Sequence, residues 1–277
     1  FSTTFSLFFF CCFFWFVSAS TMNASHLQSA AIVKLNKQLT KRAISAAIHE
    51  QGDVFAVSSE GEEIVVGSAG RGTFSPFPIY SRKYGASFLA FGHSDNDLLH
   101  GSRNSWDQTI RLLDVRTVRY RSYFSGHRSP VSDLAWHPTR DTFASGSVDG
   151  SLRLWDVRSA GATGLIHVTP GSTVKGGVVC AFDPQGTVLA VGAPRGQLRL
   201  YDVRKYDGGP FARFASPAPA SSAVGHSASN PVDFTSLSFC PDGKQFAAAT
   251  ADGTIFLHDA FSGAVHHILD ARTSLNE

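Results

Sequence analysis

The feature that most constrains the fold is the stretch GHRSPVSDLAWHPTRDTFASGSVDGSLRLWD, which occupies residues 126–156. It begins with Gly126-His127, ends with Trp155-Asp156 and carries an Asp-Gly pair at residues 149–150. Between these marks lie three short runs rich in apolar residues, at residues 131–136, 142–147 and 152–157. Short runs separated by Pro and Asp-Gly turn chemistry predict consecutive antiparallel strands.

The same pattern returns at regular intervals along the chain. The aspartates that close the third run of successive copies are 42, 46 and 57 residues apart: Asp114, Asp156, Asp202 and Asp259. A period of about 40–45 residues, with Gly-His at the start and Trp-Asp at the end, is typical of the WD repeat, which forms one blade of a β-propeller. The sequence therefore predicts an all-β fold with five blades, at residues 43–80, 83–124, 126–168, 174–214 and 232–270.

Propellers of this repeat most often have about seven blades. We expect the remaining two to be missing from a truncated chain, and a true five-bladed ring is the alternative. The run Ala31 to Leu35 predicts an outer strand of the kind that closes such a ring. An Ala/Ser/Pro-rich insertion lengthens the last interval, so residues 215–231 predict a mobile surface loop, and residues 271–277 a tail.

Residues 1–21 differ from the rest of the chain. They contain an apolar run from Phe5 to Val17, which is shorter than the ~20 residues that a membrane span needs. No basic residue precedes this run, and Met22, the single methionine of the chain, follows it. We therefore expect translated upstream sequence before Met22 and a propeller within residues 22–270, with a secretory signal peptide as the alternative.

Four polar or aromatic residues of the best repeat predict a hydrogen-bonded relay: His127, Ser145, Asp149 and Trp155. The same residue types occur in hydrolase triads, but in WD repeats they are typical of a structural network. Buried polar groups need partners, and these four satisfy one another. We expect Asp149 to accept from the His127 ring, His127 to meet Ser145, and Ser145 to accept from Trp155. Ser147, one pleat away from Ser145, remains an alternative.

Nothing else in the chain predicts chemistry. It has no Gly-x-Ser-x-Gly elbow, P-loop or dinucleotide-binding motif, so no catalytic residue, cofactor or enzymatic activity is expected. His266-His267 lacks further ligands nearby, and Cys180 and Cys240 belong to no C-x-x-C pair, so no metal site is expected either. We expect the two cysteines to be small buried apolar residues.

The charge balance points away from direct contact with nucleic acid or a membrane. Only 17% of the residues are charged, and the net charge is +2. One basic run has the composition to contact phosphate or acidic peptide, but we expect it to be a solvated face. It contains Arg116, Arg119, Arg121 and Arg128.

Residues 81–214 resemble a narrower family, the WD-repeat subunit shared by COMPASS-type histone lysine methyltransferase complexes and by transcription-termination and RNA 3′-end processing machinery. The resemblance extends over about residues 27–270 and includes a plant relative that promotes flowering. The more particular matching segments are SRKYGASFL (81–89), LYDVRKYDGGPFARF (200–214) and DGTIFLHDAFSGAVHHIL (252–269). The chain departs from the pattern in the missing final blades, in the insertion at 216–231 and in GSTVKGG at 171–177.

The resemblance implies a non-catalytic nuclear scaffold. Its partners would be methyltransferase-complex subunits, or subunits of a phosphatase-containing termination complex, with an indirect association with chromatin. A generic WD-repeat substrate receptor, such as a ubiquitin ligase subunit, is the alternative. A secreted hydrolase would need both a genuine signal peptide and an activated serine. Loops at the propeller rims are the expected partner-binding sites, with no residue singled out.

Overall fold

A computed structural model describes residues 41–270, except residues 52, 69–70, 72, 76, 160, 170–175 and 217–232. The apolar segment 1–21, the run 31–35 and the tail 271–277 lie outside the described residues, as does most of the insertion at 215–231. The described residues form 21 strands and one turn of 3-10 helix, Tyr206–Gly208, with no α-helix among them. The predicted all-β fold is confirmed.

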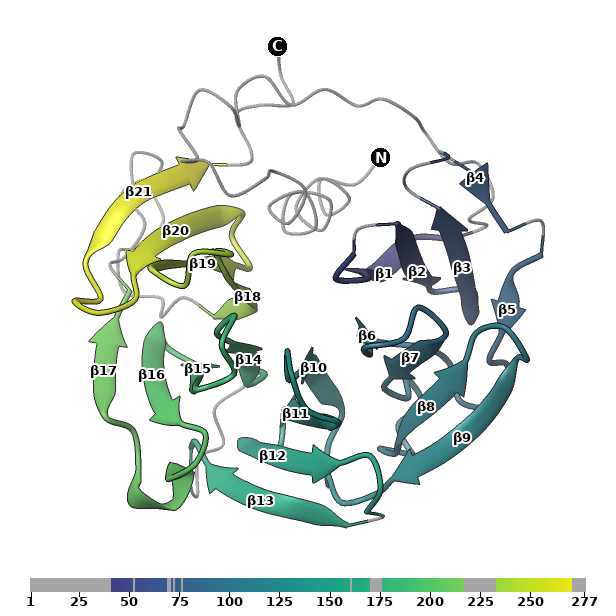
Figure 1. The fold of residues 1–277 in the computed structure, drawn as a ribbon, viewed down its shortest axis with the longest axis horizontal. Coiled ribbons are helices and arrows are strands. Elements are labelled where there is room, and N and C mark those ends of the chain that lie inside the picture. Colours follow the sequence, from purple (N-terminus) through teal and green to yellow (C-terminus); the bar gives the residue numbers. More distant parts are fainter. Residues whose placement is uncertain are drawn as a thin grey trace.

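The strands form five antiparallel sheets, one for each blade, which follow one another around a common axis (Figure 1). Blade one contains β1 (Ala43–Ile48), β2 (Val54–Ser59), β3 (Glu63–Ser68), β4 (Thr73–Phe74) and β5 (Ile79–Tyr80). Blade two contains β6 (Leu89–Phe91), β7 (Asp97–His100), β8 (Ile110–Asp114) and β9 (Arg119–Phe124). Blade three contains β10 (Val131–Trp136), β11 (Thr142–Ser147), β12 (Ser151–Asp156) and β13 (Ala162–His167).

In blades four and five, as in the others, the first strand is innermost and the last strand is outermost. Blade four contains β14 (Val179–Phe182), β15 (Val188–Ala193), β16 (Gln197–Asp202) and β17 (Ala212–Ala215). Blade five contains β18 (Phe234–Phe239), β19 (Gln245–Thr250), β20 (Thr254–Asp259) and β21 (Val265–Asp270). The innermost strands contact one another in chain order: β1 with β6, β6 with β10, β10 with β14, and β14 with β18.

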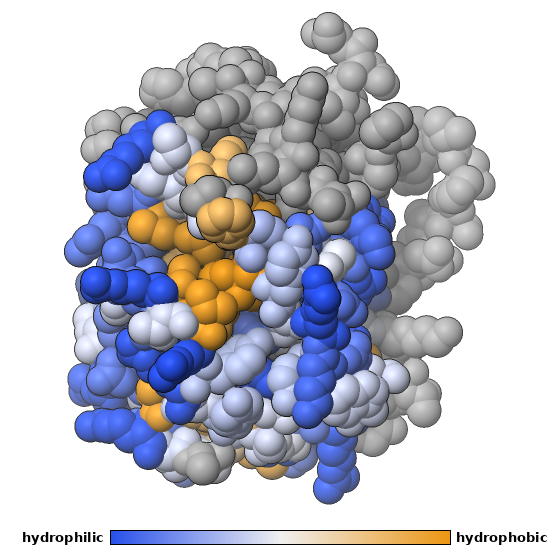
Figure 2. All heavy atoms as spheres, turned by 90° about the vertical axis from the view of Figure 1, so that its right-hand side faces the viewer, coloured by the Kyte–Doolittle hydropathy of each residue, from blue (hydrophilic) through white to orange (hydrophobic). Residues whose placement is uncertain are grey.

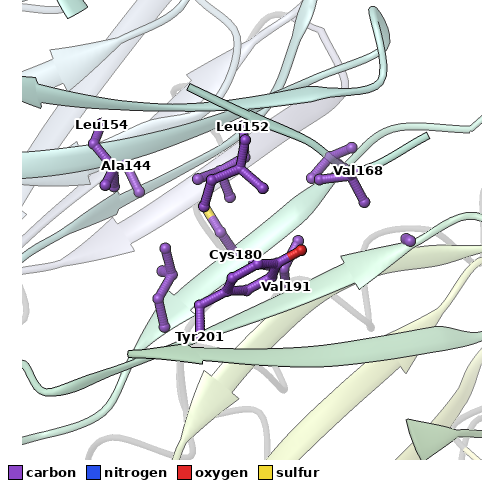
Figure 3. Packing of buried hydrophobic residues seen from close by; sticks show 11 residues of the cluster. Ala144, Leu152, Leu154, Val168, Cys180, Val191 and Tyr201 are labelled. Carbon is purple, nitrogen blue, oxygen red and sulfur yellow. The ribbon is translucent and has the colours of Figure 1, made fainter. Parts of the chain in front are cut away.

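The hydrophobic core lies between the blades. Each joint between consecutive blades holds one cluster of buried side chains, because alternate residues of the two middle strands point toward opposite neighbours. Figure 3 shows the joint of blades three and four, where Ala144, Leu152 and Leu154 meet Cys180 and Tyr201. Cys180 is therefore a small buried residue, as expected, whereas Cys240 is only half-buried.

Hydrogen bonds from the inner strands also cross the joints. A β-bulge between Val131 and Asp133 turns the Asp133 carboxylate toward blade four, where it accepts from the Cys180 backbone N–H at 2.9 Å. Burial raises the pKa of Asp133 to about 7, against the opposing effect of hydrogen bonds from the Cys180 and Leu134 backbones. Ser45, after the corresponding bulge in blade one, accepts from the Leu89 N–H of blade two at 3.1 Å.

Candidate functional site

The four residues of the expected relay lie together in blade three. His127 precedes β10, Ser145 is on β11, Asp149 is in the turn between β11 and β12, and Trp155 is on β12. Trp155 Nε1 lies 2.8 Å from Ser145 Oγ, and Ser145 Oγ lies 2.7 Å from His127 Nε2. His127 Nδ1 lies 3.1 Å from Asp149 Oδ2. The relay therefore runs from β12, the third strand of the sheet, through β11 to the turn at one end of the sheet.

The donors and acceptors fix the direction of every hydrogen bond. The Trp155 indole can only donate, so Ser145 Oγ accepts from it and turns its own proton toward His127 Nε2. The ring then carries its proton on Nδ1 and donates it to Asp149. Ser145 is 0% exposed and His127 is 7% exposed, so both polar groups depend on these partners rather than on water.

Asp149 anchors the relay to the backbone as well. Its Oδ2 also accepts from the Arg128 N–H at 3.0 Å, and its Oδ1 accepts from the Ser151 N–H at 2.9 Å. Partial burial acts to raise the pKa of Asp149, but the hydrogen bonds from His127, Ser151 and the Arg128 backbone outweigh it and hold the pKa well below its usual range. The carboxylate is therefore charged at neutral pH, as an acceptor from several N–H groups should be.

Ser147, the alternative to Ser145, has different partners. Its hydroxyl lies 2.9 Å from the Ser129 carbonyl and 3.0 Å from the Pro130 carbonyl. It also accepts from the Asp149 N–H at 3.1 Å. Ser147 thus ties the loop before β10 to the β11–β12 turn, while Ser145 faces the ring of His127.

Blade three alone carries the full set among the residues that the structure describes. By ladder register, the position of Trp155 is taken by Leu113, Tyr201 and His258 in blades two, four and five, and by Gly67 in blade one. The ring stacking is kept in blade five, where Phe246 lies 5.2 Å from His258 with 9° between the planes, compared with 6.0 Å and 15° for Phe143 and Trp155. Stacking is thus more widely shared than the relay.

Replacing His127 with alanine should destabilise the protein by about 1–3 kcal/mol, because Ser145 and Asp149 would each lose a buried partner. Thermal or urea unfolding of the variant measures the loss. Ser159→Ala is a suitable control, since Ser159 lies in the β12–β13 turn and its hydroxyl makes only an exposed hydrogen bond at 3.4 Å. Equal stability of His127→Ala and the parent chain would contradict the relay.

In blade two, the region that corresponds to the relay of blade three contains a cation, Arg111. The Arg111 guanidinium lies 3.5 Å from the centre of the Tyr84 ring and pairs with Asp107. His100 stands at the ladder position of Ser145, and burial lowers its pKa to about 4, so the ring is neutral. Its Nε2 lies 3.3 Å from the Tyr120 hydroxyl. The relay is therefore replaced in blade two by a tyrosine–arginine network.

Three histidines that sequence reasoning missed link consecutive blades at the end of the inner strands. The Nε2–H of His49 donates to the His93 carbonyl at 3.2 Å, that of His93 to the Arg140 carbonyl at 3.0 Å, and that of His137 to the Gly186 carbonyl at 3.0 Å. These bonds join blades one to two, two to three, and three to four; we call the three residues the histidine clamps. Gly186, at φ +68°, leaves room for the His137 ring, which a Cβ there would meet at 2.3 Å.

Acidification should weaken the His137 clamp. Its Nδ1 accepts from the Thr139 N–H at 3.1 Å, a bond that a protonated ring cannot keep. Burial lowers the pKa of His137 below its ordinary 6.5, although the bond to Gly186 acts the other way. The unfolded chain therefore takes up the proton first as the pH falls. The free energy of unfolding should be highest above about pH 6.5 and decrease below it.

Urea unfolding at several pH values from about 7 to 5 tests this dependence. The matched variant is His137→Asn, whose side-chain oxygen can still accept from Thr139 N–H but which does not titrate. We expect a flatter dependence of stability on pH in the variant than in the parent chain. The same slope in both proteins would show that other groups cause the dependence.

The inner strands of all five blades surround a central cavity of about 540 Å³. Apolar and small residues supply much of its wall, among them Leu89, Leu134, Ala181 and Leu237. No group of three or more His, Cys, Asp or Glu that could hold a metal ion occurs among the described residues. His266 and His267 lie exposed on the outer strand β21. The described part of the chain also has no helix with the length and hydropathy of a membrane span.

The basic run is exposed, and one of its members is engaged in ion pairs. Arg121 contacts Asp97 at 2.7 Å and Asp114 at 2.5 Å, and hydrogen bonds from the Thr117 backbone and then from Arg121 lower the pKa of Asp114 to about 2. Arg116, Arg119 and Arg128 are exposed and make no ion pair with a described residue. Arg119 and Arg121 lie on β9, and Arg116 and Arg128 lie in the segments before and after it.

The arrangement of blades and the relay define the class of this protein as a WD-repeat β-propeller. The family model described as "WD domain, G-beta repeat" matches residues 118–156 and 219–259. WD repeat-containing protein 82 of Drosophila melanogaster is 34% identical over 239 residues, which are 86% of this chain and 70% of that protein. The chain belongs to the WD-repeat family of which WD repeat-containing protein 82 is a member.

Two yeast relatives match a smaller part of their own length. Set1 complex component swd2 of Schizosaccharomyces pombe is 35% identical over 187 residues, 67% of this chain and 48% of that protein. COMPASS component SWD2 of Saccharomyces cerevisiae is 32% identical over 187 residues, 67% of this chain and 51% of that protein. The chain thus spans about half the length of these two relatives.

Proposed function

We propose that this chain is a non-catalytic scaffold subunit of a nuclear histone lysine methyltransferase complex of the COMPASS type. The observation that carries the proposal is the similarity to two proteins named as components of the Set1 complex and of COMPASS. A propeller suits the role, because its blades present many separate loops and edges to partners on one rigid frame.

The geometry of the relay supports the absence of catalysis. A nucleophilic serine must reach a substrate and have its proton taken by an adjacent base. Ser145 is fully buried, and its oxygen already accepts from Trp155. The histidine beside it is held between Ser145 and Asp149, so this arrangement supports a role in stabilising the blade rather than in acting on a substrate.

The finer part of the proposal is a role in transcription termination and RNA 3′-end processing, together with indirect association with chromatin. It rests on the resemblance carried by segments such as residues 81–89 and 200–214. The same scaffold would then hold either methyltransferase subunits or termination factors.

Affinity purification of the tagged full chain from nuclear extract, followed by mass spectrometry, tests the proposal. We expect methyltransferase-complex subunits to be recovered with the chain, and termination factors as a second group. A ubiquitin ligase adaptor recovered in their place would favour the substrate-receptor alternative. Recovery of neither methyltransferase nor termination subunits, with the tagged chain intact and soluble, would overturn the proposal.

A further inference from the structure

The outer edge of blade one is interrupted in a way that the outer edges of the other blades are not. Strand β3 pairs with β4 at Gly67↔Phe74 and with β5 at Ile64↔Ile79. Between these pairs β3 has two residues, whereas the outer chain has four, residues 75–78. This mismatch makes a bulge in the ladder, and Phe77 lies within it. Bulges at sheet edges commonly redirect a side chain toward a functional position.

This bulge exposes large apolar side chains. Phe77 is 79% exposed and Tyr80 is 51% exposed, although a typical phenylalanine is mostly buried. Phe74 and Ile79, on the same two short strands, are half-buried beside them. Figure 2 shows apolar surface on this side of the molecule, flanked by hydrophilic side chains. Exposed apolar patches with a polar rim mark interaction sites, and aromatic residues are enriched where binding energy is concentrated.

The rim of this patch is cationic. Arg71 lies in the β3–β4 turn, and Arg82 and Lys83 follow β5; all three are exposed and make no ion pair with a described residue. The Arg82 guanidinium lies 5.2 Å from the centre of the Tyr80 ring, so charge and apolar surface are adjacent.

Carboxylates nearby do little to balance this charge. Glu60, in the β2–β3 turn, already pairs with Arg42 at 2.9 Å and with Arg103 at 3.8 Å. Glu62, in the same turn, makes no ion pair with a described residue, and Glu63 is buried opposite Tyr80 on β3. The three exposed cations outnumber these two carboxylates. The rim therefore keeps an excess of positive charge that a partner can complement.

We propose that the blade-one edge, defined as Phe77, Tyr80, Arg71, Arg82 and Lys83, docks an acidic segment of another protein subunit. The segment places apolar side chains against Phe77 and Tyr80 and carboxylates against the three cations. This inference rests on the proposed function, in which the chain holds other subunits. The same edge of a second copy is an unsuitable occupant, because it would bring like charges together.

Photo-crosslinking in the purified complex tests the occupant. A benzophenone-bearing phenylalanine analogue replaces Phe77 and, as the control, Phe261, which is 82% exposed in the β20–β21 turn of blade five. We expect position 77 to crosslink one recurrent segment that has apolar residues and more Asp and Glu than Lys and Arg, and position 261 not to crosslink that segment. Crosslinks to a basic segment, to another copy of this chain, or none in a complex that assembles would each overturn the proposal.

A synthetic peptide with the sequence of the crosslinked segment then measures the contribution of each group. Phe77→Ala and Arg82→Glu should each weaken binding by about tenfold or more, whereas Phe261→Ala should leave it unchanged. Binding should also weaken as ionic strength rises from about 0.05 M to 0.5 M. Thermal unfolding of the variants verifies that the fold is intact. Equal affinity of Phe77→Ala and the parent chain would overturn the proposal.

The docking role of the blade-one edge and the proposed function can fail independently, and these experiments distinguish the two failures. An acidic segment from a protein outside any methyltransferase complex would support the blade-one edge and overturn the proposed function. An intact methyltransferase complex without crosslinks from position 77 would support the proposed function and overturn the docking role of the blade-one edge.

Discussion

Replacing Trp155 with alanine is expected to destabilise the protein by about 3–5 kcal/mol. Trp155 is 0% exposed and stacks on Phe143, with ring centres 6.0 Å apart, while its edge faces Phe124 at 5.9 Å. Truncation would leave a cavity at the joint of blades two and three and would remove the one donor that orients Ser145. Urea unfolding, with the midpoint and slope both recorded, measures the change.

Trp155→Phe separates packing from hydrogen bonding at the same position. Phenylalanine keeps a ring between Phe143 and Phe124 but has no N–H to donate to Ser145. We expect most of the packing contribution to be retained, with a remaining loss of about 1–2 kcal/mol from the missing hydrogen bond and the smaller ring. If Trp155→Phe were as unstable as Trp155→Ala, the donor rather than the stacked ring would dominate.

The architecture of blade three could be predicted from sequence because its signals are local. The turn at residues 149–150 and the short runs on either side of it specify a meander without reference to the rest of the molecule. The relay could also be predicted, since a buried His, Ser, Asp and Trp in one repeat have few other ways to satisfy their polar groups. The choice of Ser145 over Ser147 needed coordinates, because a shift of one pleat changes which side chain faces the ring.

The histidine clamps show a different limit. His49, His93 and His137 are spaced 44 residues apart, so a signal was present in the sequence. Each contact, however, joins residues one repeat or slightly more apart, 44, 47 and 49 residues in the three cases, from one blade to the next. Its partner is a backbone carbonyl, which every residue possesses, so composition does not reveal the bond. Only the stacking of neighbouring sheets brings donor and acceptor together.

The blade-one edge could not be predicted from the sequence for a related reason. The sequence TFSPFPIY, residues 73–80, places Pro76 and Pro78 between β4 and β5, which argues locally against one continuous outer strand. The position of the break is not set by β4 and β5 alone. The break depends on which β3 residues pair with them, and that register is set by the whole sheet. The exposure of Phe77 follows from the bulge and could not be inferred from its residue type, which favours burial.

The close packing of blades three and four requires a glycine at position 146, because there is no room there for a side chain. A Cβ on Gly146 would lie 1.9 Å from the Val178 carbonyl oxygen and 2.7 Å from the Val178 carbonyl carbon, and both are backbone atoms. The neighbouring strand β14 would have to move as a unit. That movement would separate Asp133 from the Cys180 N–H and open the apolar cluster of Figure 3.

Gly146→Ala should therefore destabilise the protein by about 3 kcal/mol, at the upper end of the range for overpacking, because no flexible side chain can relieve the clash. Gly161→Ala is the matched control, since a Cβ at Gly161 meets nothing within 4 Å. Urea unfolding of both variants measures the difference, and near-UV circular dichroism reports whether the aromatic core of the altered joint stays ordered. Equal stability of the two variants would mean that β14 shifts at little cost, and that the joints between blades tolerate far more movement than their packing indicates.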